Sequence, residues 1–389
     1  MAAAAAAASK PPAPIPRSRT SETRPSQRHA LVLGWKGTAE LIASALAEEG
    51  FTTTLERELP AGSRMPRPAD PASLDAARAA LARFASLAPK SAALYVHPGV
   101  SLWAERPMLQ TLGQEVGLEV IGPSARSLTF FANRLNLMTE AEKAGIPHLV
   151  SSFEPIHSLR EITQLVKSRR AKFPFLLKSV HGGGAGRFLI REDEDLERRL
   201  DLWMEQVRRQ SGEVILFTER YVEGARYVVQ PFARLNDGRF ETFPSYDASL
   251  QSRYRKVLSF CPCESIDAEV AASIRESSQR LADQAGFVGV GSFEFMVDGT
   301  RAYLVEGSAR LDTNFHLWER VAGTSAVSWQ LAAQESSSGP LPPRTPASDA
   351  VSGIALRILA EDSLLQLPHP GRIHEVGLQR DWKFPGASA

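Results

Sequence analysis

The chain has 389 residues, of which 43% are hydrophobic and 23% are charged, and its formal net charge at pH 7 is +1. This composition is ordinary for a globular protein, and the near-zero charge argues against a nucleic-acid or membrane-surface role driven by bulk charge. The length exceeds one compact domain, so we expect two or three units around a shared cleft.

Two features bear on the compartment. Residues 1–28 are rich in Ala, Pro, Arg and Ser and cannot bury a core, so we expect a disordered tail, with an organelle transit peptide as the alternative. Cys261 and Cys263 flank one proline, which is too close for an easy disulfide and too few for a tetrahedral sulfur site. No run reaches the length of a membrane-spanning helix. We therefore predict a cytoplasmic protein, with organelle import as the alternative.

The first predicted elements, over residues 29–125, alternate short apolar runs with helical spacing. "HALVLGW", "SAALYVHPGV" and "GLEVIGPSA" each predict a strand followed by a turn, and "KGTAELIASALAEEGF" predicts a helix between them. This alternation predicts a small α/β unit with a mostly parallel sheet. "VLGWKG" contains only a fragment of a dinucleotide-binding fingerprint.

The elements that follow are mostly antiparallel. "SLTFFANRLNLMTEAEKAGIP" predicts one helix that stops at Gly145 and Pro147. "FPFLLKSV" and "RFLIRE" predict two strands joined by a glycine-rich loop, and "NDG" and Asp298-Gly299 predict hairpin turns. "DAEVAASIRESSQRLADQAGF" predicts an amphipathic helix, and "QESSSGPLPPRTPASDA" an exposed loop. The second half is therefore predicted to be α+β.

The glycine-rich loop carries the first chemical signal. Lys178 ends the strand before the loop, so the order differs from that of a P-loop, in which the lysine follows the glycines. Glycine amides can close over phosphate oxygens while the lysine supplies a point charge. An ordinary long hairpin loop is the alternative.

Two glutamates carry the second signal. Glu294 and Glu306 lie in apolar strands on either side of a turn, where carboxylates rarely occur without partners. A facing pair of glutamates suits Mg²⁺, which takes one or two carboxylates together with nucleotide phosphates. Two salt-bridged glutamates are the alternative.

Together these motifs resemble the ATP-grasp fold, and more closely biotin carboxylase and the large subunit of carbamoyl-phosphate synthase. The resemblance covers residues 29–375 and rests on "VHPGVSLWAE", "VIGPSA", "LLKSVHGGGAGR", "TERYVEGARYV", "DASLQSRYRKVLSFCP", "FEF", "VEGSAR" and "LRILAEDSLLQLPHPGRI". It implies an α+β fold with a parallel-sheet α/β domain, a small lid and a larger mixed or antiparallel sheet domain. The implied ranges are a tail at 1–28, the α/β domain at 29–128, an ATP-grasp domain at 129–335 with its lid at about 148–215, and a truncated C-terminal segment at 336–389.

The resemblance also implies the site residues. The implied catalytic residues are Lys256, Arg310, Asp312 and Arg357. The implied ATP-binding residues are Arg134, Lys178, Gly182, Gly183, Gly184, Gly186, Glu219, Arg220, Tyr221 and Val222. The implied ligands of Mg²⁺ or Mn²⁺ are Glu294, Glu306 and Ser308.

Several positions depart from the family pattern. Asn314 occupies the position of the bicarbonate base, and Asp312 supplies a carboxylate two residues earlier. Tyr227 and Tyr254 replace two histidines, and Arg134 replaces a lysine. Asparagine cannot take a proton at neutral pH, so these departures bear on the reaction more than on ATP or metal binding.

The implied function is that of a ligase that activates bicarbonate as carboxyphosphate with ATP. No A-M-K-M motif is present, so biotin would arrive on a separate carrier protein. The alternatives are a ligase that joins another small carboxylate to an amine or thiol, and a nucleotide-binding subunit without catalysis. Neither nucleic acid nor a membrane is an expected partner, and a homodimer is a candidate assembly.

Overall fold

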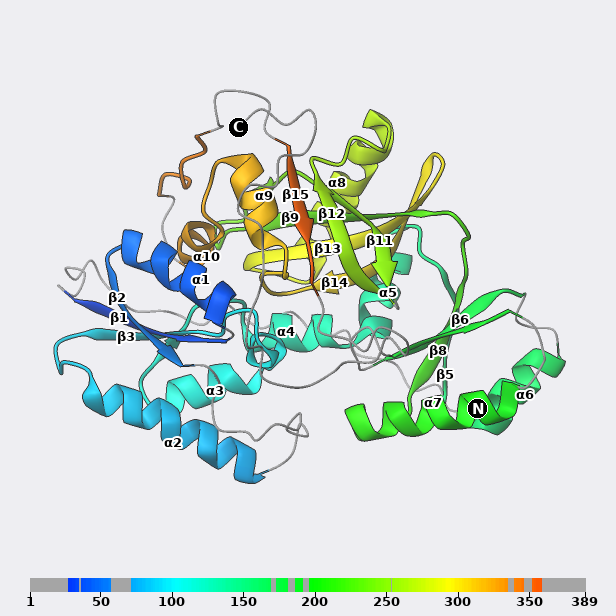
Figure 1. The fold of residues 1–389 in the computed structure, drawn as a ribbon, viewed down its shortest axis with the longest axis horizontal. Helices are drawn as coiled ribbons and strands as arrows, with labels where there is room; N and C mark the ends of the chain where they lie inside the picture. Colours follow the sequence, from blue (N-terminus) through cyan, green and yellow to red (C-terminus); the bar gives the residue numbers. More distant parts are fainter. Residues whose placement is uncertain are drawn as a thin grey trace, which may run out of the picture.

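Three β-sheets organise the chain in the computed structural model (Figure 1). The structure describes residues 27–34, 36–56, 71–168, 173–180, 186–191, 196–252, 254–334, 339–345 and 352–358. No helix in these ranges is both long and apolar enough to cross a membrane.

The first sheet is parallel throughout and has the strand order β2-β1-β3-β4. Side chains alternate along β1, so Ala30 and Val32 pack toward α1 while Leu31 and Leu33 pack toward α2 and α3. Helices therefore cover both faces, as a parallel sheet requires (Figure 1). The predicted α/β arrangement is confirmed. The elements are β1 Arg28–Leu33, α1 Lys36–Glu48, β2 Phe51–Glu56, α2 Pro71–Leu87, β3 Ala93–His97, η1 Leu102–Glu105, α3 Met108–Glu115 and β4 Glu119–Val120.

The helix predicted between the first two sheets is broken into two, α4 (Ala125–Ala132) and α5 (Arg134–Lys143). Asn133 ends α4 in an extended conformation and caps α5, because its side chain accepts a hydrogen bond from the Asn136 N–H at 3.1 Å. The prediction of one helix was wrong at this point, since the cap competes with helix continuation. The break places Arg134 at the first position of α5.

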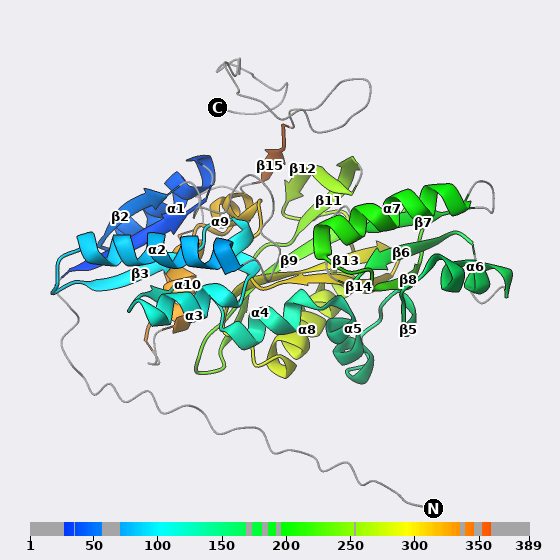
Figure 2. The same ribbon diagram turned by 90° about the horizontal axis from the view of Figure 1, so that it is seen from below.

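The second sheet, which we call the lid sheet, has the order β5-β8-β6-β7 and is antiparallel. Helices α6 and α7 cover one of its faces through residues such as Ile162, Phe175 and Leu200 (Figures 1 and 2). The predicted strands before and after the glycine loop are confirmed as β6 and β7. The elements are β5 Val150–Ile156, α6 Leu159–Lys167, β6 Phe175–Ser179, β7 Arg187–Ile190, α7 Leu196–Ser211 and β8 Leu216–Arg220.

The third sheet, the large sheet, has the order β14-β13-β9-β11-β12-β15, with β10 paired to β9. Its strand pairs are antiparallel, and both predicted hairpins are present, as β9–β10 and β13–β14. Phe293 and Phe295 point into a core shared with α5 and α8, so the opposite face of β13 is free for polar residues. The elements are β9 Arg226–Arg234, β10 Phe240–Thr242, β11 Tyr246–Ser252, β12 Arg255–Cys261, α8 Ala268–Gln284, β13 Gly289–Asp298, β14 Arg301–Ser308, α9 Phe315–Ala322, α10 Ala326–Gln334 and β15 Gly353–Leu356.

Candidate functional site

Three charged side chains share one face of the lid sheet. Lys178 on β6 is the register partner of Arg187 on β7, and Glu219 on β8 lies diagonally from Lys178. The residues that alternate with Lys178 pack under α6 and α7, so the charged face is the one that these helices leave uncovered. The strand pairing therefore positions an ammonium, a guanidinium and a carboxylate together.

Lys178 and Glu219 form a buried ion pair. Lys178 Nζ lies 2.5 Å from Glu219 Oε2, and the two side chains are only 2% and 1% exposed. Burial lowers the pKa of Lys178 to about 8, against the opposing attraction of Glu219. Apart from this ion pair, neither Glu219 oxygen accepts a hydrogen bond from a described residue. The pair is therefore desolvated and makes few hydrogen bonds, as expected of groups in a binding site for a polar ligand.

The two predicted metal ligands lie directly opposite each other on β13 and β14. Glu294 and Glu306 are register partners, and this hairpin pairing was foreseen from the sequence. Glu306 accepts from Arg134 Nη2 at 2.7 Å and from Arg187 Nη2 at 2.8 Å, whereas Glu294 pairs with Lys256 Nζ. Burial alone would raise the pKa of Glu306, but the two arginines outweigh it and hold this pKa far below its usual range.

These residues fit a divalent cation that also contacts phosphate. Cross-strand neighbours have Cβ atoms about 5 Å apart, which lets both carboxylates reach one ion. Ser308 ends the same strand and adds a half-buried hydroxyl oxygen. No group of three or more His, Cys, Asp or Glu that could hold a metal occurs in the described part of the chain. Two carboxylates completed by phosphate oxygens are the donor set that Mg²⁺ prefers. The role of these residues as ligands remains a prediction.

Arg310, a predicted catalytic residue, has a carboxylate partner. Arg310 Nε donates to Glu105 Oε1 at 2.5 Å, which joins the end of η1 to the segment after β14. Burial opposes the charge of Arg310, but Glu105 and other carboxylates raise its pKa. Arg357 is exposed and follows β15, and its backbone N–H donates to Val257 O at 2.8 Å. This bond sets Arg357 next to the strand that carries Lys256.

Asp312 and Asn314 do not lie on a strand. β14 ends at Ser308 and α9 begins at Phe315, so both residues belong to the connection between them. The chain turns in this segment to enter α9. Asp312 Oδ1 accepts the Asn314 N–H at 2.6 Å, and Asn314 Nδ2 donates to Ser259 Oγ at 3.0 Å.

Asp312 is buried, at 8% exposure, and burial raises the pKa of its carboxyl group against the attraction of Lys256 and Arg310. Tyr246 also faces this group. Its hydroxyl is fully buried without a regular hydrogen-bond partner among the described residues, and the charges of Asp312 and Glu294 add to burial in raising its pKa. The sequence did not single out Tyr246, because a strand tyrosine has the pattern of a core residue.

The predicted ATP-binding residues Glu219 to Val222 lie on a strand only in part. β8 ends at Arg220, so Tyr221 and Val222 belong to the connection toward β9. Val222 packs against a small apolar cluster of Leu149, Met296 and Val305, which lies on the glutamate-bearing face of the large sheet. Of the predicted glycine loop, Gly186 is described and buried, whereas Gly182, Gly183 and Gly184 lie outside the described residues.

Arg187 is the residue that the sequence prediction missed. It closes the quoted "LLKSVHGGGAGR" motif, so the signal was present, but only Lys178 was given a role there. Burial opposes its charge, yet the oxygens of Tyr227, Glu306, Glu294 and Glu219 together raise its pKa. The site therefore gathers four cationic side chains against three carboxylates: Arg134, Lys178, Arg187 and Lys256 against Glu219, Glu294 and Glu306.

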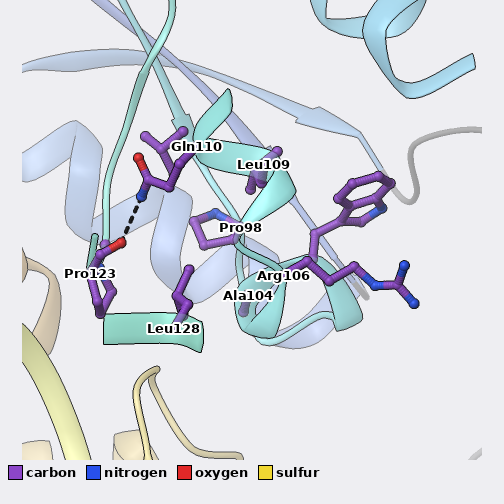
Figure 3. A pocket seen from close by; sticks show the side chains of 10 residues that line it. Pro98, Ala104, Arg106, Leu109, Gln110, Pro123 and Leu128 are labelled. Carbon is purple, nitrogen blue, oxygen red and sulfur yellow. Dashed lines mark hydrogen bonds between the residues drawn. The ribbon is translucent and has the colours of Figure 1, made fainter. Parts of the chain in front are cut away.

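A separate small pocket lies beyond the carboxyl ends of β3 and β4 (Figure 3). Pro98, Leu109 and Leu128 line it, and Gln110 Nε2 closes one side by donating to Pro123 O at 2.7 Å. Among the described residues that line it, Arg106 is the only ionisable one, and none is a predicted site residue. We therefore assign the chemistry to the charged cluster between the lid sheet and the large sheet.

Comparison with known proteins identifies the family of the chain. Residues 133–337 match the family described as "Carbamoyl-phosphate synthase L chain, ATP binding domain". The chain belongs to this family. The matched range begins beside Arg134, contains the lid sheet, and extends past α10 of the large-sheet region. Membership confirms the ATP-grasp resemblance that the motifs indicated.

The curated relatives of the chain include carboxylases. The biotin carboxylase of Halalkalibacterium halodurans is 27% identical over 287 residues, which are 73% of this chain and 62% of that protein. The mitochondrial pyruvate carboxylase of Rattus norvegicus is 27% identical over 283 residues, 72% of this chain and 24% of that protein. The chain thus spans less than two thirds of the length of these relatives.

The similar solved structures confirm the α+β fold. The biotin carboxylase domain of the Hydrogenobacter thermophilus 2-oxoglutarate carboxylase, solved as a dimer with MgADP, ADP and bicarbonate, has a TM-score of 0.72 at 22% identity and covers 88% of this chain and 77% of its own. Biotin carboxylase from Campylobacter jejuni has a TM-score of 0.71 at 21% identity and covers 89% of this chain and 79% of its own.

Proposed function

We propose that the chain is an ATP-dependent ligase of the biotin carboxylase type, which activates bicarbonate as carboxyphosphate for transfer to biotin on a separate carrier. The supporting observation is the buried charge cluster between two sheets. Lys178 and Arg187 on the lid sheet face Glu306 on the large sheet, and Arg134 and Lys256 bring the cations to four. Cationic side chains gathered in a site of low dielectric suit a polyphosphate.

In this proposal, Lys178 and Arg134 bind the phosphates of ATP, and the apolar cluster around Val222 receives the adenine ring. Mg²⁺, held by Glu294 and Glu306, would neutralise charge on the transferred phosphoryl group. A bicarbonate oxygen attacks the γ-phosphorus; a new O–P bond forms as the bond to the ADP oxygen breaks. The protein mainly orients the reactants and stabilises charge.

Asp312 is the proposed proton acceptor for bicarbonate. Its Oδ1 is held by the Asn314 N–H, which leaves Oδ2 to take the proton. The raised pKa of this buried carboxyl group makes it a better base than an exposed aspartate. Arg310 and Lys256 lie within electrostatic range of Asp312 and would bind the anion beside it. Arg357 would stabilise the biotin enolate.

A second candidate function rests on Asn314. Its Nδ2 donates to Ser259 Oγ at 3.0 Å, so the family's base position is occupied by a hydrogen-bonded amide. An amide there favours a ligase that couples another carboxylate to an amine or thiol, or a nucleotide-binding subunit without catalysis.

The deciding experiment measures ADP release from MgATP with and without bicarbonate and with and without free biotin. We expect slow release that depends on bicarbonate and increases with biotin, because the amide of Asn314 cannot act as a base at the family position. Asn314→Glu restores a base at the family position, so it should raise this turnover at least ~10-fold, within the usual contribution of a positioned base. Thr313→Glu is the matched control, because it adds the same charge at an adjacent exposed position. If the rate of ADP release is the same with and without bicarbonate in both the wild type and Asn314→Glu, the result would support the second candidate function.

A further inference from the structure

Arg187 connects the lid sheet to the large sheet through three contacts. Its Nη2 donates to Glu306 Oε2 at 2.8 Å, and its Nη1 donates to Tyr227 Oη at 3.3 Å. Its guanidinium also lies over the ring of Tyr254, 5.5 Å from the centroid. The first residue of β7, directly after the glycine loop, is thereby tied to β14, β9 and the start of β12.

The contact with Glu306 stands in the way of a metal ion. Arg134 and Arg187 each take one oxygen of the Glu306 carboxylate, so a cation that approaches Glu306 meets two guanidinium groups. Like charges at contact distance repel, most strongly where water is excluded. At least one arginine must therefore move before a divalent cation can bind Glu306.

The two arginines differ in their freedom to move. Arg134 lies on α5 and donates a second hydrogen bond to Ser179 O at 3.0 Å. Arg187 keeps the Tyr227 oxygen and the Tyr254 ring if it leaves Glu306, and its buried Nε donates to none of the described residues. Arg187 would therefore keep its contacts with Tyr227 and Tyr254 after leaving Glu306, and its Nε could donate to a new partner. Of the two arginines, Arg187 can move away from Glu306 at the lower cost in free energy.

We propose that Arg187 is a latch on the metal site: it occupies Glu306 in the free protein, and a divalent cation displaces it toward the phosphates of the bound nucleotide. This inference rests on the proposed ATP-binding function. The planar guanidinium then supplies Nε and Nη donors in the fork that fits two phosphate oxygens. The guanidinium keeps its contacts with Tyr227 and Tyr254 in both positions. These two tyrosines stand where the family has histidines.

The latch predicts opposite effects of one substitution on two ligands. Arg187→Met removes the competitor for Glu306 but keeps a long apolar side chain. We expect Mn²⁺ to bind the nucleotide-free variant at least ~10-fold more tightly than the wild type, because a carboxylate oxygen is released. MgATP should bind at least ~10-fold more weakly, because a phosphate donor is lost.

The experiment titrates the nucleotide-free protein with Mn²⁺ by electron paramagnetic resonance and measures MgATP affinity by calorimetry. Arg208→Met is the matched control: Arg208 is an exposed arginine on α7 that pairs with Glu205 at 3.0 Å, and neither affinity should change. Arg187→Lys keeps the positive charge but loses the forked geometry of the guanidinium. Its affinity for Mn²⁺ should stay near that of the wild type, while its affinity for MgATP should fall. This variant also tests the latch if Arg187→Met does not fold.

Mn²⁺ affinity that is unchanged or lower in folded Arg187→Met would overturn the latch, and so would a rise of similar size in Arg187→Lys. The Mn²⁺ titration needs no nucleotide. A wild-type protein that binds Mn²⁺ but not MgATP would therefore contradict the proposed function. The Mn²⁺ titrations of the wild type and Arg187→Met would still test the latch.

Discussion

The buried Lys178–Glu219 pair allows the contribution of Lys178 to ligand binding to be separated from its contribution to stability. Lys178→Met leaves Glu219 fully buried without its partner, because the two side chains are 2% and 1% exposed. Removing one partner of a buried ion pair typically costs ~3–5 kcal/mol. Replacing both partners with uncharged groups of similar size is often close to neutral, so Lys178→Met/Glu219→Gln should recover most of this loss.

The assay has two parts. Tryptophan fluorescence monitors unfolding in urea, and calorimetric titration measures the affinity for MgATP. We expect the single variant to lose stability and the double variant to regain it, while MgATP affinity falls at least ~10-fold in both, because neither restores the ammonium that binds phosphate. Glu219→Gln alone completes the cycle and shows how far the two effects add.

Two results would refute this reasoning. A Lys178→Met protein as stable as the wild type would mean that Glu219 is solvated or neutral in the folded protein. A double variant that binds MgATP with the affinity of the wild type would remove Lys178 from the phosphate site, whatever its contribution to stability.

Two further predictions concern the turn after β3. His97 is fully buried, accepts the Gly99 N–H at Nδ1 (2.9 Å) and pairs through Nε2 with Gln330 (3.0 Å), and burial lowers its pKa to about 4. In the unfolded state His97 has a pKa near 6.5, so the unfolded state binds more protons than the folded state between pH 4 and 6.5. The free energy of unfolding should therefore fall by up to ~3 kcal/mol as the pH drops through this window. A His97 imidazole that titrates near pH 6.5 by NMR in the folded protein would contradict this prediction. Gly99→Ala should cost at least ~3 kcal/mol by urea unfolding, because φ is +65° and a Cβ would lie 1.8 Å from Leu33 O. Gly145→Ala has the same φ in open space and should cost only ~1–2 kcal/mol, and equal losses in the two variants would exclude the clash.

The sequence alone determined the features that depend on local physics. Alternating apolar residues and turn glycines predicted β13 and β14, and the turn after Asp298 sets their pairing as far as Phe295 and Leu304. An irregularity in the register between Phe295 and Glu294 then sets Glu294 opposite Glu306. Lys178 at the end of a strand before glycines marked the phosphate-binding candidate without any tertiary information. These patterns are local because pleat, helical period and turn conformation are set by neighbours in the chain.

Only the tertiary structure decided which charges meet. Arg187 contacts Glu306, 119 positions away in the chain, and Arg310 contacts Glu105, 205 positions away, so no spacing rule could pair them. The position of Asp312 outside a strand depends on how the chain enters α9, where Asn314 is the N-cap residue. Ion pairs form between whichever charged faces the packing of sheets brings together, and burial then fixes their pKa values. The sequence could therefore name most of the charged residues of this site, but not their partners, because partners are chosen by packing between elements that are distant in the chain.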